Sequence, residues 1–144
     1  ESLRRAFPEA RVEVLDHFDD KTMTEASIRR ARALWPPAPE TIASPHLRWL
    51  GLPADIIRAP LAIHELRSID VRVAWFCEAR RCLSPGGRVI VVEHLRDLPN
   101  FLAFGPGFVH FHGESAWRDS WAAADLRLDR TFPITPFVRA FVLK

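Results

Sequence analysis

The sequence has little of what would tie it to a membrane, a polyanion or an oxidising compartment. No apolar run approaches the roughly 20 residues that cross a bilayer. A net charge of +2 over 144 residues gives no strong case for a nucleic-acid or membrane partner. The two cysteines, Cys77 and Cys82, have the spacing of neither a zinc site nor a redox motif. On a helix they would point in different directions, so we expect no disulfide between them. We also expect the protein to be cytoplasmic, since nothing suggests an oxidising compartment.

A glycine-rich loop between a strand and a helix is also missing. The only Gly-x-Gly, at Gly105-Pro106-Gly107, follows no strand-to-helix pattern, and Gly86-Gly87 belong to a turn. Such loops let the backbone approach a nucleotide cofactor closely. Their absence weakens an assignment to the nicotinamide-dependent oxidoreductases, which stay an alternative.

What the sequence does contain is an alternation of helical and strand patterns. The predicted elements are, in order, a helix over 2–7, a strand over 11–16, a helix over 22–35, a strand over 56–63, a helix over 67–83, a strand over 89–92, a helix over 114–124, and strands over 126–132 and 137–143. Loops are predicted over 36–45 and 95–113. This order favours a single α/β domain with a mostly parallel sheet, ending in an antiparallel hairpin.

Local signals support several of these elements. Thr22 and Glu25 have the capping-box spacing, so we expect the first long helix to begin at Thr22. Pro60 weakens the strand over 56–63, because proline cannot donate to a sheet ladder. The strand over 89–92 is apolar throughout, which suits burial on both faces. Two groups of residues are expected to pack inward: Ile69, Val73, Phe76 and Leu83 as one helical stripe, and Trp117 with Trp121 as another.

The segment "RRCLSPGGRVIVVEH", Arg80 to His94, carries a resemblance to a known family. With the helix and hairpin after it, it resembles the C-terminal half of class I S-adenosylmethionine-dependent methyltransferases, over about 67–143. The likeness is to the small-molecule branch, the type-11 and ubiquinone-biosynthesis-like group. "ARVEVLD" looks like the family's second strand and "LAIHEL" like the end of its fourth.

The resemblance implies a Rossmann-like sheet in which the family's first strand and glycine-rich loop are missing. We therefore expect Glu1 to be an artificial or partial-gene start, and the chain to be an inactive fragment of a methyltransferase. The implied cofactor is S-adenosylmethionine, and the implied partner is a small-molecule methyl acceptor. In the whole enzyme, an acceptor oxygen, nitrogen or carbon would attack the sulfonium methyl in line.

The resemblance also implies which residues form the site. The cofactor would be bound by Asp16, whose carboxylate would accept from the ribose hydroxyls, and by His17, Ile63 and His64. The acceptor would meet Glu93, His94, Asn100, Phe104, His110 and His112. His64 or His94 would act as a base if the acceptor must lose a proton. Ligands of open α/β sheets gather at the carboxyl ends of strands, so Asp16, His64 and His94 should converge on one crevice.

Each of these residues has a plainer interpretation. Asp16 could be an ordinary strand-end acid, His64 could pair locally with Arg67, and Glu93 with His94 could cap the following loop. His110 and His112 would face the same way on an extended segment, but no further ligand is spaced convincingly, so no metal is expected.

A different class of function also fits the missing loop. The chain could be a non-catalytic α/β interaction module with a degenerate methyltransferase fold. The exposed sheet edge and the phenylalanine-rich segment 101–111 would then be its interface. The sequence does not predict an oligomeric state.

Overall fold

The computed structural model describes residues 2–21, 23–39, 41–43, 49 and 53–144. They form two compact units, Glu1–Arg48 and Trp49–Lys144, which are described separately. No helix among the described residues is long and apolar enough to cross a membrane.

The first unit contains short elements and little core. Its elements are α1 (Ser2–Ala6), β1 (Leu15–Asp16), α2 (Ala26–Leu34) and β2 (Ile42–Ala43), with β1 and β2 paired in parallel. The strand predicted over 11–16 is therefore reduced to its last two residues. Val14 is exposed and α2 has no buried residue, so the described residues of this unit offer no apolar layer for a longer strand to pack on.

Helix α2 also begins later than the capping box predicted. Glu25 occupies the N-cap position and its side chain makes no capping hydrogen bond. The prediction that the helix begins at Thr22 is therefore wrong, and Thr22 itself lies outside the described residues.

The second unit is built on a four-stranded mixed sheet, which confirms the α/β fold. Its strands are β3 (Ala54–Pro60), β4 (Leu83–His94), β5 (Leu128–Thr135) and β6 (Val138–Leu143), in the order β3-β4-β6-β5. Strands β3 and β4 are parallel, and the terminal hairpin adds antiparallel pairs. Pro60 is tolerated because it is the last residue of an edge strand.

The Pro-Gly-Gly turn is an irregularity at the start of β4. The register with β3 shifts between the pairs Ala54–Leu83 and Ile56–Arg88. Gly86 has φ +81°, a conformation that residues with a Cβ rarely adopt. A Cβ on Gly87 would lie 3.0 Å from the carbonyl oxygen of Ser84, so both positions require glycine.

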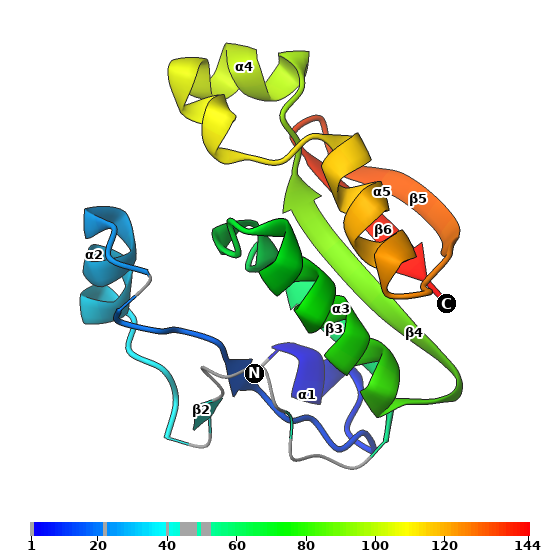
Figure 1. Ribbon diagram of the computed structural model, residues 1–144. Helices are drawn as coiled ribbons and strands as arrows, with labels where there is room; N and C mark the ends of the chain where they lie inside the picture. Colours follow the sequence, from blue (N-terminus) through cyan, green and yellow to red (C-terminus); the bar gives the residue numbers. More distant parts are fainter. Residues whose placement is uncertain (1, 22, 40, 44–48, 50–52) are drawn as a thin grey trace. The chain divides into compact units, whose positions relative to one another are not determined.

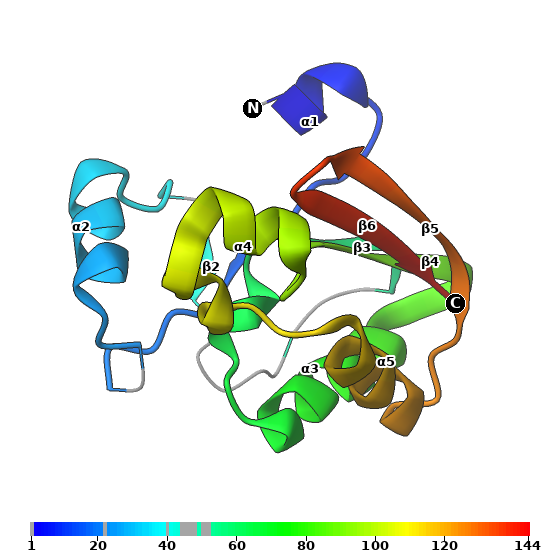
Figure 2. The same ribbon diagram turned by 90° about the horizontal axis from the view of Figure 1, so that it is seen from above.

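Helices α3 (Ile69–Cys82) and α5 (Glu114–Ala123) cover the same face of this sheet, as seen in Figure 1 and Figure 2. Trp117 and Trp121 are buried as predicted. The predicted stripe of α3 is confirmed at Phe76, which is buried, and is wrong at Ile69, which is exposed. The face that packs inward carries Arg72, Trp75, Phe76, Ala79 and Cys82.

Arg72 explains why the stripe could not be identified by hydropathy. Its guanidinium is buried and donates to the carbonyl oxygens of Leu66 and Arg67 at 2.9 and 2.8 Å. It also donates to the hydroxyl of Ser120 in α5 at 3.2 Å. A charged residue thus sits on the inward face and joins two helices.

The predicted loop over 95–113 contains two further helices, which is a correction. Helix α4 (Leu98–Phe104) begins after Asp97, whose side chain accepts from the backbone N–H of Asn100 at 3.0 Å. A 3-10 helix, η2 (Gly105–His110), follows it. Cys77 and Cys82 are both free, as expected.

Candidate functional site

Two polar segments meet at the carboxyl ends of β3 and β4. Because these strands are parallel neighbours, their ends lie at one edge of the sheet. Strand β3 is followed by a 3-10 turn, η1 (Ile63–Glu65), and β4 ends on Glu93 and His94. The backbone N–H of Leu61 donates to the carbonyl of Val92 at 2.7 Å, which holds the turn beside the end of β4.

The carboxylate of Glu93 organises this turn. It is completely buried, and its Oε1 accepts from the backbone N–H groups of Ala62, Ile63 and His64 at 3.1, 2.8 and 3.2 Å. Glu93 therefore fixes the backbone that presents His64.

The second oxygen of Glu93 fixes the ring of His64. Nδ1 of His64 lies 2.7 Å from Oε2 of Glu93, and the side chain of His64 is 13% exposed. An ionised carboxylate only accepts hydrogen bonds, so the proton is assigned to Nδ1 and the lone pair to Nε2. Burial alone would lower the pKa of His64, but the hydrogen bond and charge of Glu93 outweigh it and raise that pKa.

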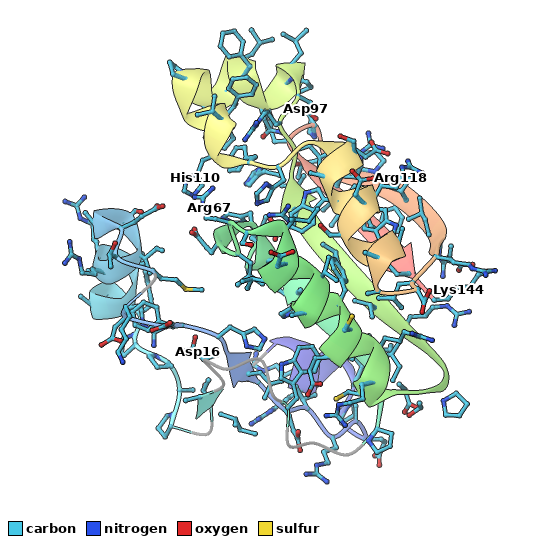
Figure 3. The ribbon with its side chains drawn as sticks, in the orientation of Figure 1. Asp16, Arg67, Asp97, His110, Arg118 and Lys144 are labelled. Carbon is cyan, nitrogen blue, oxygen red and sulfur yellow. The ribbon has the colours of Figure 1, made fainter. Side chains whose placement is uncertain are left out.

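A polar rim surrounds Nε2 of His64. Oε1 of Glu65 lies 3.4 Å from this nitrogen and 3.6 Å from Nε2 of His110. Arg67 extends from the end of the turn toward His110, as Figure 3 shows, and donates to its carbonyl oxygen at 2.7 Å. The plainer sequence interpretation paired Arg67 with His64, whereas the structure pairs it with His110 and Glu65.

Aromatic rings form the neighbouring wall of the site. Phe111 is buried and stacks on His94, with ring centroids 4.8 Å apart, and its edge meets His64 at 6.1 Å. Phe104 is exposed and contacts both His94 and Phe111. His64 and His94, predicted to converge, are thus both beside Phe111.

Asn100 holds His94 in this position. The amide of Asn100 donates to Asp97 and to the carbonyl of Phe137, and its oxygen lies 3.2 Å from Nδ1 of His94. Asn100 is buried, and its side-chain nitrogen and oxygen are both occupied by these contacts within the chain. The geometry favours a positioning role over the predicted contact with an acceptor.

His110 and His112 do not face the same way, because the segment before them is helical and not extended. His110 joins the rim, whereas Nε2 of His112 lies 3.3 Å from Arg72 and its ring meets Trp117 edge-on. Burial, followed by the charges of Arg72 and Arg67, lowers the pKa of His112 to about 4. His112 is therefore neutral near pH 7.

Asp16 and His17 belong to the first unit. Oδ2 of Asp16 accepts from Arg32 at 2.8 Å, and Oδ1 accepts from the backbone N–H of Phe18 at 3.1 Å. Burial would raise the pKa of Asp16, but the bonds from Arg32 and Phe18 lower it overall. The convergence of Asp16 with His64 and His94 stays a prediction.

Sequence reasoning did not assign a role in the site to Glu65 or Arg67, whereas Phe111 belongs to the phenylalanine-rich segment that it expected to line the pocket. Glu65 and Arg67 are close to His64 in sequence, which was a usable signal. Their contacts with His110, and the contact of His64 with Phe111, could not be predicted from the sequence, because these contacts depend on where α4 and η2 return the chain to the end of β3.

No protein-family model and no curated protein matches the sequence. Solved structures match its fold. Mitomycin 7-O-methyltransferase matches with a TM-score of 0.72 at 18% identity, over 99% of this chain and 44% of that chain. A Sulfolobus solfataricus protein described as a type 11 methyltransferase matches with a TM-score of 0.61 at 15% identity, over 99% and 77%. LepI in complex with SAM matches with a TM-score of 0.63 at 13% identity, over 99% and 38%.

The chain thus spans less than half the length of the first and third of these proteins. Identities this low establish a shared fold, and a fold alone does not fix a reaction. The chain shares the α/β fold of mitomycin 7-O-methyltransferase and of the type 11 methyltransferase structure.

Proposed function

We propose that this chain is the C-terminal part of an S-adenosylmethionine-dependent methyltransferase that acts on a small molecule. The observation that carries the proposal is the His64–Glu93 pair. It lies where the carboxyl ends of two parallel strands meet, in a fold shared with methyltransferases. When bound, the cofactor supplies a methyl group on a sulfonium, which is reactive without further activation.

The residues proposed to hold the cofactor are Asp16, His17, Ile63 and His64. A carboxylate has about four lone-pair sites, and Asp16 uses two of them on Arg32 and Phe18. Two sites stay open to the adjacent hydroxyls of a ribose, so the chemistry of Asp16 fits the cofactor. The glycine-rich loop that would approach the rest of the cofactor is not part of this sequence.

His64 is the proposed base for an acceptor that must lose a proton. Its Nε2 lone pair is directed away from Glu93, because Nδ1 carries the proton that Glu93 accepts. The acceptor proton would move to Nε2, and the buried carboxylate would stabilise the resulting imidazolium. His94 is bonded through Nδ1 to the carbonyl oxygen of Phe137 at 2.9 Å, which leaves its Nε2 available, so His94 stays the alternative base and also lines the proposed acceptor pocket.

The proposed acceptor pocket is aromatic on one side and polar on the other. His94, Phe104 and Phe111 form the aromatic side, and Glu65 with His110 forms the polar side. Apolar walls with a few placed polar groups are typical of small-molecule sites. We infer a flat, apolar acceptor with one ionisable group.

Binding of S-adenosylhomocysteine, followed by saturation-transfer NMR, tests this proposal. The chain should bind weakly, since it lacks the loop, and Asp16→Asn should weaken binding further. Asp129→Asn, a carboxylate of the hairpin, is the matched control and should have no effect. Micromolar binding by calorimetry would contradict the inferred need for an additional loop, and preferential binding of NADH would favour the oxidoreductase alternative.

A non-catalytic interaction module is the second candidate. It is favoured by the apolar side chains that α4 and η2 expose, which are Leu98, Phe101, Leu102, Phe104 and Val109. If the chain binds neither nucleotide cofactor at millimolar concentration, this candidate takes precedence.

A further inference from the structure

The rim of the site contains a group of residues with the composition of a metal site. His64, Glu65 and His110 each offer one donor atom, and these atoms all lie within 4.8 Å of one another. The sequence predicted no metal, because His110 and His112 were weighed with His94 or Glu93 as further ligands and not with His64 and Glu65. The structure separates these two histidines and brings His110 to the turn after β3.

The spacing of the donor atoms suits a tetrahedral ion. Zinc binds imidazole nitrogen and carboxylate oxygen at about 2.1 Å, so two ligands of a tetrahedral site lie about 3.4 Å apart. Oε1 of Glu65 lies 3.4 Å from Nε2 of His64 and 3.6 Å from Nε2 of His110. The donor atoms of the two histidines lie within 4.8 Å of each other and must approach to about 3.4 Å to complete the set.

The buried Glu93 supplies the second, independent observation. Histidine ligands commonly donate their other ring N–H to a carboxylate, which fixes the tautomer and increases the basicity of the ligand nitrogen. Glu93 is fully buried, and its Oε2 lies 2.7 Å from Nδ1 of His64. The lone pair of His64 Nε2 is therefore directed toward Glu65 and His110.

One cation already lies beside two of these three residues. The guanidinium of Arg67 contacts the ring of His110, and Nη2 lies 3.8 Å from Oε2 of Glu65. The side chain of Arg67 is 42% exposed, so it has room to turn into solvent. It therefore acts as a competitor for the same ligands.

We propose that His64, Glu65 and His110 bind a zinc ion or a similar divalent transition metal, with the fourth coordination position open. Two imidazoles and one carboxylate match the ligand set of zinc sites that keep an exchangeable position. The inference goes beyond the proposed function and does not depend on it. Because the ion uses the Nε2 lone pair of His64, metal binding and proton removal by His64 exclude each other.

Calorimetry with Zn²⁺, and visible spectroscopy with Co²⁺, test the site on the 144-residue chain. The background variant is Cys77→Ser, which removes an exposed thiol. We expect one zinc per chain and a Co²⁺ spectrum of tetrahedral type. His110→Gln and Glu65→Gln should each weaken zinc binding at least about 100-fold, and Glu93→Gln about 10–100-fold through the loss of an outer partner.

Arg67→Gln separates a metal site from a merely structural cluster. Removing the competing charge should tighten zinc binding about five-fold. The matched controls are His112→Gln and His17→Gln, which should bind zinc like the background variant. Thermal unfolding without metal checks that each variant is folded.

Three results would overturn the proposal. They are a dissociation constant above about 1 mM, unchanged affinity in folded His110→Gln, and a loss in the His112 control as large as in His110→Gln. None of these results bears on binding of S-adenosylhomocysteine, so the two proposals fail independently.

Discussion

Removing the carboxylate of Glu93 should destabilise the second unit strongly. In Glu93→Ala, the N–H groups of Ala62, Ile63 and His64 and the Nδ1–H of His64 lose their acceptor. A buried donor without a partner costs about 1–3 kcal/mol. The N–H of Ile63 is buried and the other three donors are partly buried, so we expect a loss of about 3–5 kcal/mol in the free energy of unfolding.

Urea unfolding followed by tryptophan fluorescence measures this loss, since Trp75, Trp117 and Trp121 are all buried in the same unit. Glu93→Gln keeps one oxygen for the backbone donors and should lose only about 1–2 kcal/mol. Glu65→Gln is the matched control: its carboxylate is 22% exposed, so the loss should stay below about 1 kcal/mol.

The tautomer of His64 gives a second readout. In Glu93→Gln the amide oxygen serves the backbone donors and the NH2 group faces Nδ1, so Nδ1 must accept and the ring proton moves to Nε2. Ring-nitrogen NMR should find the proton on Nδ1 in the parent chain and a shift toward Nε2 in the variant. A loss below about 1 kcal/mol in Glu93→Ala, or the same tautomer in both chains, would refute the reasoning.

Three further outcomes follow from packing and charge. Gly87→Ala should lose about 1–3 kcal/mol, because its Cβ would meet the backbone oxygens of Ser84 and Ala54 at 3.0 and 3.1 Å; Gly107→Ala, whose Cβ has open space, should be neutral in the same urea titration. Trp121→Ala should lose about 3–5 kcal/mol from the core, and a folded variant of parental stability would contradict its packing. The carboxyl of Asp16 should titrate below 3.8 by NMR, because its pairing with Arg32 lowers its pKa in the folded chain. This pairing therefore stabilises the fold above pH 3.8, and the stabilisation is lost as the pH falls through the lower folded pKa. Arg32→Gln should raise the titration midpoint of Asp16, and an unchanged midpoint would show that the ion pair is absent.

The parts of the fold that the sequence predicts are those that local patterns determine. A short stretch of sequence is enough to predict three features: the four apolar residues Val89–Val92, the tryptophan pair of α5 and the hairpin. Helix α4 was missed because the segment 95–113 is rich in phenylalanine, proline, glycine and histidine, a composition that suggested a loop. Its start signal, an N-cap Asp97 followed by Pro99, was present in the sequence.

The site was predicted in part for the same reason. Its strand-end residues, His64, Glu93 and His94, follow from the rule that ligands gather at the carboxyl ends of strands. The partnership of His64 with Glu93, and the approach of His110, depend on contacts between distant segments. The pattern of apolar and polar residues within one segment does not predict contacts between distant segments.

The most direct test of the methyltransferase account is a map of where the cofactor product binds. Amide chemical shifts of the 144-residue chain are followed while S-adenosylhomocysteine is added to millimolar concentration. The account predicts that the changes concentrate at Asp16, His17, Ile63 and His64. Changes confined to other residues, no change at all, or an equal response to NADH would contradict it.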